Sequence, residues 1–574
     1  MAYVTVVPAI RTIPGVEAFD YAIPPDADVR PGDLLRVPFR TKLIPALVIA
    51  CTDTSAHADK AKNIEDPRAI LRLGHASVTL LQDIADRAFV SKPSVLASWV
   101  RSVPARAKPI TEMRTSSQPS MPQRTVRYLQ DRWNGPEGII ESARGSGGST
   151  LILCPWQNRA ERLAQEIDAP VLHAGLAAGK AWTLVRGFIQ GEIPRLVTTR
   201  VGAWLSVVAD ATLIDEPEND DHKQDELSPR VDARWVVDRC STLRPSASVL
   251  SFATTPRLSS QDWRVAPEVS ADVTPDIWQR RGSSAVECLT SRSEQAIHAA
   301  IEQGKPVLIV HGTTGERSRI ACRDCGWTAA CVACGFPLAR ITGGALCRKC
   351  ARRSGLPLEC ASCRGTDLSR GYPGIDRIAS QCKTEFGPGV RVLSVSDWEN
   401  ADIAPDTLVI LTDIASLAGS IEDIRRRERL LIAWRRTASR IAAAGARGII
   451  QGKEEPLNDA FTWLTADGVT HAWMRELDER RLFSYPPAVS FAKLLCDGPA
   501  SVAETLAAEL KSTLPEYCTI NGPYPVPHRA STRTERHVIH VIAPKDTPPS
   551  DLQNALNPYK NRAMIDLDPV AFFA

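Results

Sequence analysis

The sequence predicts a multidomain α/β protein on three observations: its length, two stretches in which apolar strands alternate with helical segments, and a cysteine-rich insertion within the second stretch. With 574 residues, the chain is far longer than a single hydrophobic core usually organises. Its 44% hydrophobic and 24% charged residues are typical of globular proteins. Several domains with separate cores are therefore expected.

A small β-rich module is expected at the N-terminus. The runs VTVVPAI, FDYAIPPDADVRPGDLLRVPFR and IPALVIA, all within residues 1–50, resemble short strands separated by Pro-Gly, Pro-Pro and Pro-Asp turns. Residues 76–103 carry apolar side chains at three- and four-residue spacing, which predicts a helix. The Pro-, Ser- and Arg-rich stretch 104–125 is typical of a linker.

The middle of the chain predicts parallel sheets covered by helices. From about residue 150 to 258, the strands LILCP, RLVTT, ATLID and SVLSFAT alternate with helical segments such as QNRAERLAQEI. A second α/β stretch starts at PVLIV (306–310) and resumes after residue 366 with VRVLSVS, TLVILT and RGIIQG. The last hundred residues predict an α+β domain, from the helix SVAETLAAELKSTL and the strand HVIHVIAP.

The cysteine-rich insertion predicts two structural zinc sites. Its ligands form four Cys-x-x-Cys pairs: Cys322/Cys325, Cys331/Cys334, Cys347/Cys350 and Cys360/Cys363. Two intervening residues let one tight turn aim two thiolates at an ion, and tetrahedral zinc needs two such turns. Eight thiolates therefore make two closed sites whose binding energy folds the insertion. Sequential and nested pairing of the four turns both satisfy this chemistry.

The other cysteines are expected to be inert core residues. The chain has 15 cysteines, and those outside the insertion include Cys51, Cys154, Cys240 and Cys496, which lie in apolar runs. The N-terminus lacks the basic and apolar regions of a signal peptide, and no run of about 18 apolar residues predicts a membrane span. A cytoplasmic protein is expected, in which paired cysteines bind metal more often than they form disulfides.

The sequence offers only part of a nucleotide site. The phosphate-loop pattern Gly-x-x-x-x-Gly-Lys-Ser/Thr is absent, and the nearest run, GSGGST (145–150), lacks the lysine and precedes a strand instead of following one. Asp215 and Glu216 do follow the strand ATLI, where a Walker-B pair would hold Mg²⁺. A solvated loop is the alternative interpretation of this acid pair.

Ordered motifs along most of the chain resemble the bacterial family of primosomal replication-restart proteins, PriA (primosomal protein N′). These motifs are FDYAIP (19–24), VRPGDLLRVPFR (29–40), LHAGL (172–176), GEIPRLVTTRVGAW (191–204), DEPENDDHKQDELSPRVDAR (215–234), FATTP (252–256), PVLIVHGTTG (306–315), ACRDCGWTAACVACGFPLAR (321–340), GYPGIDRI (371–378), ERRLFSYPP (479–487) and NGPYPVP (521–527). The spacing of the cysteines together with the acidic DEPEND segment makes this resemblance specific.

The resemblance implies a domain order. The expected parts are an N-terminal 3′-end DNA-binding domain (1–103), a linker (104–125), RecA-like helicase lobe 1 (126–262), a connector that starts lobe 2 (263–316), the zinc module (317–366), RecA-like helicase lobe 2 (367–475) and an α+β C-terminal domain (476–574). A winged-helix domain of the family has no counterpart between residue 103 and lobe 1.

Roles for individual residues also follow from the resemblance. It implies nested zinc pairing, in which Cys322, Cys325, Cys360 and Cys363 hold one ion and Cys331, Cys334, Cys347 and Cys350 hold the other. Asp20, with Phe19 beside it, would line the pocket for the terminal 3′ nucleotide. Arg40 stands where the family has a pocket glycine, and its guanidinium would pair with a phosphate.

Departures from the family pattern imply that the motor is lost. The Walker-A segment is expected to be deleted, so its lysine has no counterpart, and the family's acidic DEEH motif reads DEPE, which keeps Asp215 and Glu216 as a remnant. The arginine-finger motif is reduced to AWRRTASR (433–440), of which Arg440 remains. Without charge-neutralising groups, phosphoryl transfer fails. The chain is thus similar to degenerate actinobacterial versions that lack functional helicase motifs.

The implied function is replication restart. The chain would recognise stalled or branched DNA forks and 3′ ends of nascent strands, and help to load the replicative helicase through primosome and helicase-loading proteins, with single-stranded DNA-binding protein as a further partner. The alternative is an active ATP-dependent 3′–5′ helicase, and the resemblance implies a nucleoid-associated location.

The net charge of +3 is too small for a global DNA-binding field. Local contacts are expected from the arginines of 425–440 and from HRASTRTER (528–536), with a solvated helix face as the alternative for the first run.

Overall fold

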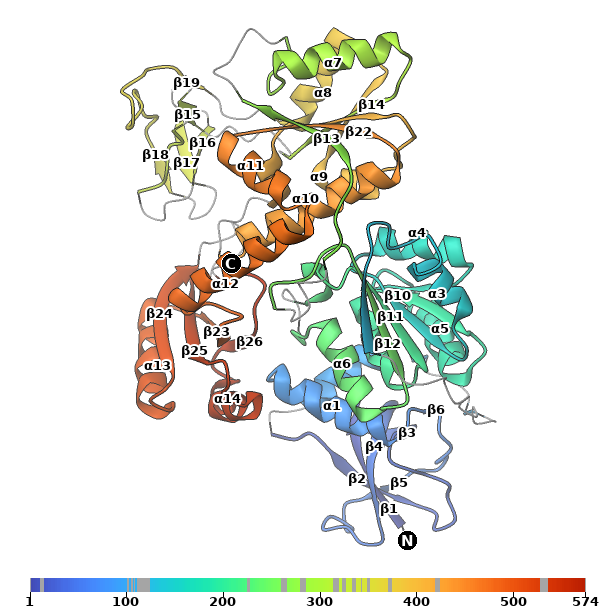
Figure 1. The fold of residues 1–574 in the computed structure, drawn as a ribbon. Helices are drawn as coiled ribbons and strands as arrows, with labels where there is room; N and C mark the ends of the chain where they lie inside the picture. The colour runs from blue at the N-terminus through green and yellow to red at the C-terminus, as the bar shows by residue number, and fades with distance from the viewer. Residues whose placement is uncertain are drawn as a thin grey trace. The chain divides into compact units, whose positions relative to one another are not determined.

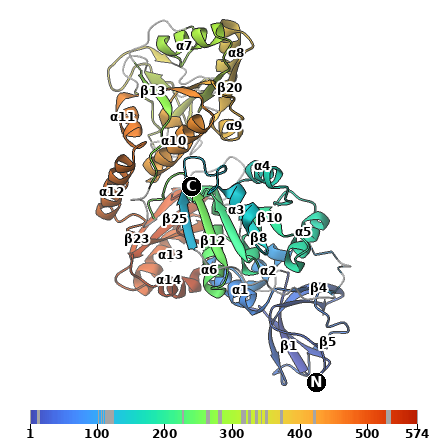
Figure 2. The same ribbon diagram turned by 45° about the vertical axis from the view of Figure 1, so that its right-hand side comes forward.

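A computed structural model (Figures 1 and 2) describes residues 2–10, 15–100, 103–104, 107, 109–110, 124–224, 228–259, 266–278, 285–312, 320–322, 327–332, 337–341, 343–347, 352–369, 374–418, 424–526 and 535–572. The chain divides into two compact units. The first comprises 1–253, 492–494 and 546–570, and the second comprises 254–491, 495–545 and 571–574. No helix of the described residues is long and apolar enough to cross a membrane.

The N-terminal β-rich module is confirmed as a six-stranded sheet with the order β5-β2-β1-β4-β3-β6. Its strands are β1 (Ala2–Pro8), β2 (Phe19–Ile23), β3 (Asp33–Phe39), β4 (Lys42–Thr52), β5 (Lys62–Asn63) and β6 (Leu71–Arg72). The sheet curls so that side chains of β2 and β3 meet, because the Tyr21 hydroxyl donates to the Pro38 carbonyl at 3.0 Å. The rings of Phe19 and Phe39 lie 5.5 Å apart.

Two helices, α1 (His75–Arg87) and α2 (Lys92–Val100), replace the single helix expected over 76–103. Phe89 has φ 53°, a left-handed conformation that ends the first helix. Pro93 lies in the first turn of α2, where its missing N–H has no intrahelical partner to lose. The apolar spacing of the sequence continues across this break and therefore does not reveal it.

The first parallel sheet has the order β7-β12-β11-β8-β10-β9, and all its neighbouring strands pair in parallel, as predicted. Its strands are β7 (Arg124–Tyr128), β8 (Thr150–Leu153), β9 (Val171–Leu172), β10 (Arg195–Thr198), β11 (Ala211–Asp215) and β12 (Ser248–Ala253). One face packs against α3 (Ile139–Gly145) and α4 (Gln157–Ile167). The other packs against α5 (Ala178–Gln190), η1 (Arg200–Val207) and α6 (Ala233–Leu243).

The N-terminal module and this sheet share one hydrophobic core. A single buried cluster contains residues of β1, β3, β4, α1 and α2 together with residues of β8, α5, η1 and α6. The indoles of Trp99 and Trp204 stack at 5.0 Å and 7° across it, and Arg239 pairs with Asp83 at 2.7 Å. Figure 1 shows α1 lying beside α6. The two segments therefore form one cooperative body within the first unit.

The second unit contains another parallel sheet, with the order β13-β22-β21-β14-β20. Its strands are β13 (Asp272–Ile277), β14 (Val307–His311), β20 (Val390–Ser394), β21 (Leu408–Leu411) and β22 (Arg447–Gly452). Helices α7 (Ser291–Glu302) and α8 (Ile375–Phe386) cover one face. The other face packs against α9 (Val395–Asn400), η4 (Ile414–Ala418), α10 (Arg426–Ala443), α11 (Glu454–Thr462) and α12 (Ala466–Leu482).

Two smaller β-structures complete the chain. In the cysteine-rich insertion, β15 (Ala321–Cys322) pairs with β19 (Leu368–Ser369), and β16 (Leu338–Ile341), β17 (Gly344–Cys347) and β18 (Arg353–Ser354) form a second sheet. The α+β end has the strand order β24-β25-β23-β26. Its elements are β23 (Val489–Asp497), α13 (Ala500–Thr513), β24 (Thr519–Val526), β25 (Arg536–Pro544), α14 (Pro549–Leu556), η5 (Asn557–Tyr559) and β26 (Met564–Leu567).

Candidate functional site

Asp20 lies in a polar group on the outer side of the curled N-terminal sheet. Its Oδ1 accepts a hydrogen bond from the Thr5 hydroxyl at 2.7 Å, and its Oδ2 accepts one from the Ser55 hydroxyl at 2.6 Å. Thr5 is the cross-strand partner of Asp20, so β1 and β2 present both side chains on one face. Because both oxygens are held, the half-buried carboxylate has a fixed orientation for a ligand.

Phe19 and Arg40 belong to a different group from Asp20. Successive side chains of a strand point to opposite faces, so Phe19 faces the inside of the curled sheet, where its ring meets that of Phe39. The guanidinium of Arg40 lies 6.0 Å from the centre of the Phe39 ring. Arg40 has φ 52° in the two-residue turn between β3 and β4, a conformation that favours glycine. The structure thus brings Phe19 near the Arg40 turn but separates it from Asp20.

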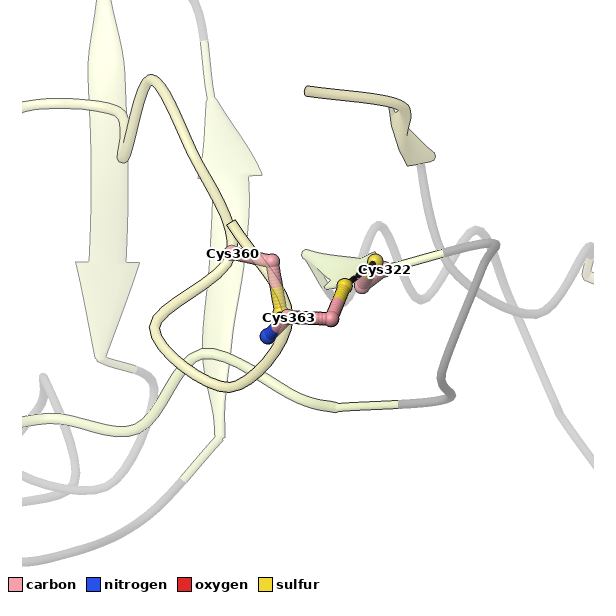
Figure 3. Close-up of side chains that lie close together, drawn as sticks. All are labelled: Cys322, Cys360 and Cys363. Carbon is pink, nitrogen blue, oxygen red and sulfur yellow. Dashed lines mark hydrogen bonds between the residues drawn. The ribbon is translucent and has the colours of Figure 1, made fainter. Parts of the chain in front are cut away.

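Three cysteines converge in the insertion. The sulfur atoms of Cys322, Cys360 and Cys363 all lie within 4.8 Å of one another, and those of Cys322 and Cys363 are 3.5 Å apart (Figure 3). Pairing of β15 with β19 places Cys322 opposite Leu368, just after the turn that carries the other two sulfurs. The backbone N–H groups of Ser362 and Cys363 point to the Cys360 sulfur at 3.3 and 3.5 Å.

This geometry fits a metal ion. Sulfur ligands about 2.3 Å from a tetrahedral zinc ion lie roughly 3.8 Å apart, which is close to the observed spacing. Cysteine binds metal as the thiolate, and the two N–H groups at the Cys360 sulfur can donate to such a ligand. The three cysteines come from the first and fourth pairs of the sequence, the combination that nested pairing requires. Cys325, the remaining member of these pairs, lies outside the described residues.

The inner cysteine pairs are described only in part. Cys331 and Cys347 are buried in one cluster with Ile320 and Leu338, whereas Cys334 and Cys350 lie outside the described residues. Of the cysteines expected to be core residues, Cys154, Cys240 and Cys496 are buried. The expectation for Cys51 is wrong, because it lies near the exposed end of β4. Its apolar neighbours in sequence alternate between the two faces of that strand.

The acid pair at the end of β11 is deeply buried, so the solvated-loop alternative is wrong. Asp215 and Glu216 are 0% and 1% exposed. Arg132 pairs with both, and its Nε donates to Asp215 Oδ1 at 3.2 Å. Arg159 on α4 also pairs with both, with its Nη2 3.2 Å from Asp215 Oδ1 and 3.3 Å from Glu216 Oε1. Two guanidinium groups thus neutralise two carboxylates.

These charges reinforce one another. Burial alone would lower the pKa of Arg159, but the carboxylates of Asp215 and Glu216 outweigh burial and raise its pKa above the ordinary value. The Arg159 guanidinium also lies 4.6 Å from the centre of the Trp133 ring, and the Trp133 indole N–H points to Asp215 Oδ1 at 3.4 Å. Arg159 is therefore firmly cationic and held in place.

Arg132 lies in a loop at the sheet edge where parallel α/β proteins bind ligands. The β7–α3 loop (residues 129–138) follows a parallel strand and leads into a helix, which is the local arrangement of a phosphate loop. The sequence predicts that the Walker-A segment and its lysine are deleted. The β7–α3 loop contains one arginine and no lysine. Carboxyl ends of parallel strands meet at one edge, so the loop after β7 reaches the acids after β11.

The sequence analysis missed both arginines. Arg159 is 8% exposed and lies on the apolar side of α4, one helical turn before Leu163, a position from which a buried anionic partner could have been inferred. Arg132 had no comparable signal, because the preceding strand β7 was not predicted: its first two residues, 124 and 125, were wrongly included in the linker.

His222 is buried in the segment that follows the acid pair. Its Nε2 lies 2.9 Å from the Asp215 carbonyl oxygen, and its Nδ1 has no hydrogen-bond partner among the described residues. Burial, with help from the charge of Arg234, lowers the pKa of His222 to about 4. The imidazole is therefore neutral at neutral pH.

This shift predicts acid sensitivity. An unfolded histidine has a pKa of about 6.5. Below that pH the unfolded chain binds a proton at this histidine, whereas folded His222 stays neutral until the pH approaches 4. The free energy of unfolding therefore falls as the pH drops from about 6.5 towards 4. Between pH 7 and pH 5 the loss from His222 is about 2 kcal/mol. Urea unfolding of wild type and His222→Gln at both pH values measures it, since other titrating groups affect both proteins alike. An equal pH dependence of the two proteins contradicts the assignment.

Lys223 connects the same segment to strand β26. Its ammonium group donates to Asp566 Oδ1 at 2.7 Å and to the Leu567 carbonyl at 2.9 Å. Lys223 is 5% exposed and Asp566 is 2% exposed, so the pair is buried. This interaction holds the DEPENDDHK run against a strand more than three hundred residues later in the chain, a partner that sequence alone does not identify.

The arginines of α10 mostly have partners within their own unit. Arg435 is 0% exposed and donates to the carbonyls of Trp463 and Pro267. Arg440 donates to the carbonyls of Trp398 and Ala401, and it also stacks over the Trp398 ring at 4.6 Å. Two further arginines form ion pairs, Arg427 with Glu479 and Arg436 with Glu399. Most of the second basic run, 528–536, lies outside the described residues.

Comparisons with known proteins agree with the sequence motifs. A family model described as the PriA 3'DNA-binding domain (3'BD) matches residues 10–100, and one described as the Primosomal protein N C-terminal domain matches residues 481–570. The first model covers the segment that contains Asp20 and Arg40. The second covers β23 to β26 and the partner of Lys223.

Some relatives align with part of the chain, and others align with nearly its whole length. Proteins named Replication restart protein PriA are 29% identical over 219 residues in Thermotoga maritima and 24% identical over 302 residues in Bacillus subtilis. These alignments cover 36% and 47% of this chain but only 29% and 35% of the relatives. The Rickettsia felis protein of that name is 21% identical over 652 residues, with 99% of each chain covered. Two family models in the expected order, together with an end-to-end relative, show that the chain is similar along its length to the PriA family of replication restart proteins.

Proposed function

We propose that this protein is a replication restart factor that binds branched DNA at the 3′ ends of nascent strands and helps to load the replicative helicase without helicase activity of its own. The observation that carries the DNA-binding part is the match of residues 10–100 to a 3′ DNA-binding domain, within which Asp20 is a preoriented acceptor. An oriented carboxylate can accept a hydrogen bond from a terminal sugar hydroxyl or from a base. Arg40, on the turn between β3 and β4 near Phe39 and apart from Asp20, supplies a cation for a phosphate elsewhere on the bound strand.

We further propose that the insertion holds two zinc ions in nested sites. Cys322, Cys325, Cys360 and Cys363 bind the first ion, and Cys331, Cys334, Cys347 and Cys350 bind the second. Convergence of three sulfurs from the outer pairs supports the first set, and burial of Cys331 and Cys347 in one cluster supports the second. Closed four-thiolate sites build structure and leave no position for a reacting water. The insertion then acts as a docking platform for primosome and helicase-loading proteins.

The parallel sheets of the two units correspond, in this proposal, to two degenerate helicase lobes. Loss of the motor is supported by the partners of the acid pair, because Asp215 and Glu216 are neutralised by arginines and not left open to a magnesium ion. The internal partners of Arg440 support the same conclusion, since a finger that contacts a nucleotide must be free to reach it. An active ATP-dependent 3′–5′ helicase remains the second candidate, favoured by the retained strand–loop–helix after β7.

Binding of forked DNA tests the first part. Asp20→Asn is expected to weaken binding to a fork with a free 3′ hydroxyl by about 10-fold, the effect of losing one hydrogen bond to a charged acceptor. Binding to a fork whose 3′ end is buried in duplex should change little. Asp66→Asn is the matched control, because Asp66 is an exposed acid of the same module that pairs with its near neighbour Arg68. Equal affinity of wild type and Asp20→Asn for the 3′ hydroxyl fork contradicts the proposed role.

An ATPase assay with the same forks separates the two candidate functions. If the protein is a restart factor without a motor, wild type hydrolyses ATP no faster than the Glu216→Gln variant. DNA-stimulated turnover that disappears in Glu216→Gln would establish the helicase instead.

A further inference from the structure

The carboxyl edge of the first parallel sheet retains two kinds of group that serve nucleotides in other proteins. N–H groups at the start of a helix bind phosphate oxygens, and carboxylates after a strand bind the accompanying divalent cation. In this chain the helix is α3 and the carboxylates are Asp215 and Glu216. Both kinds of group already have partners within the β7–α3 loop and on α4.

The N–H groups at the start of α3 are occupied by the loop itself. Ile139 N–H donates to the Arg132 carbonyl at 2.9 Å, and Ile140 N–H donates to the Trp133 carbonyl at 3.2 Å. A Cβ on Gly138 would lie 2.6 Å from the Trp133 oxygen and 2.5 Å from the Asn134 oxygen. Glycine at this position therefore lets the loop lie directly against the helix start.

The carboxylates are occupied by two cations. Arg132 and Arg159 carry two positive charges against the two negative charges of Asp215 and Glu216, the same balance that a divalent cation would provide. All four side chains are at most 10% exposed. Removing such charges from water is tolerated only when each has a close, oriented partner.

We propose that the β7–α3 loop is an internal pseudo-ligand: its carbonyls take the place of phosphate oxygens, and the guanidinium groups of Arg132 and Arg159 take the place of the divalent cation. This inference rests on the proposed loss of the motor and adds what replaced it. A segment that would otherwise respond to nucleotide is held in one conformation at all times.

The held segment runs from the acids to strand β26. Glu216 Oε2 accepts from the Asn219 amide at 2.8 Å, and the Asp215 carbonyl contacts His222 at 2.9 Å. The next residue, Lys223, reaches Asp566. The pseudo-ligand thus stabilises, through residues 215–223, the attachment of the C-terminal strand to the first unit.

Cation replacement tests the proposal on zinc-loaded, full-length protein. Arg132→Gln/Arg159→Gln leaves two buried carboxylates without counter-charge, so Tm is expected to fall by roughly 10 °C or more. Millimolar Mn²⁺, whose preferred ligands are carboxylate oxygens, should restore several degrees in this variant and none in wild type. Adding Glu216→Gln to the double variant should abolish the recovery. Arg144→Gln, which removes an exposed ion pair with Glu141, is the matched control. Its Tm should stay close to that of wild type, both with and without Mn²⁺.

Hydrogen exchange gives a second measurement that does not depend on the double variant folding. In wild type, exchange in residues 215–223 should be the same with and without ATP and Mg²⁺. In Gly138→Ala, where the loop cannot lie against α3, exchange in 215–223 should increase. Protection of this segment by ATP and Mg²⁺ in wild type, or recovery by Mn²⁺ equal in wild type and double variant, overturns the proposal. Neither result affects 3′-end binding, so failure of this inference and failure of the restart function are distinguishable.

Discussion

Replacement of Cys360 by serine should release one zinc ion per chain and unfold the part of the insertion around Cys322 and Cys363. Structural zinc sites contribute on the order of 10 kcal/mol to the folding of small modules, and the described residues of the insertion form a small buried cluster. Zinc content by elemental analysis and structure by circular dichroism measure the effect. Cys51→Ser is the control, because Cys51 is exposed and lies in the N-terminal module.

Double variants then determine the pairing. With nested sites, Cys322→Ser/Cys360→Ser loses the same single ion as either change alone, whereas Cys322→Ser/Cys331→Ser loses both ions. Sequential pairing predicts the reverse, so one set of zinc measurements decides between the two arrangements. If the insertion is the docking platform, Cys331→Ser also abolishes helicase loading while 3′-end binding persists, and loading that survives in this variant contradicts that role.

Replacement of Lys223 by methionine should destabilise the first unit by about 3–5 kcal/mol, the typical cost of leaving one member of a buried ion pair without its partner. The uncompensated group is Asp566, whose Oδ2 already has no hydrogen-bond partner among the described residues. In a body of this size the change corresponds to a decrease in Tm of roughly 10 °C. Chemical unfolding followed by tryptophan fluorescence measures it, since Trp99 and Trp204 report on the core of this unit.

A double-mutant cycle identifies the cause. Lys223→Met/Asp566→Leu removes both charges and should recover most of the lost stability, because paired apolar side chains replace a buried ion pair well. Arg87→Met is the matched control, since its partner Asp568 also lies at the end of β26 but is 59% exposed. A loss for Arg87→Met as large as that for Lys223→Met would show that general packing, and not the buried charge, is responsible.

Much of the fold could be predicted from the sequence because its strands are short apolar runs bounded by turn residues. The strands β8, β11, β14 and β21 follow this rule closely. Strand β13 did not, since its buried position is the polar Asp276, whereas Pro275 and the apolar Ile277 are exposed. The break between α1 and α2 depends on one left-handed residue, Phe89, which apolar spacing does not reveal.

Some residues of the candidate site could likewise be predicted from the sequence, and others could not. The cysteine pairs are local in sequence, so their spacing alone predicts candidate metal ligands, whereas the convergence of Cys322, Cys360 and Cys363 is visible only in three dimensions. The acids at 215 and 216 were found from their position after a strand. Their partners Arg132 and Arg159 lie 84 and 56 residues away along the chain, and no local pattern joins such distant charges.

The stacked indoles of Trp99 and Trp204 have a consequence for how the protein can be divided. A polypeptide ending at residue 103 would carry Trp99 and the apolar faces of α1 and α2 into solvent, since their covering surface belongs to η1 and α6. Apolar patches of this kind cause self-association. The N-terminal module is thus an integral part of the first unit, and cleavage of the chain between this module and β7 would not by itself release it.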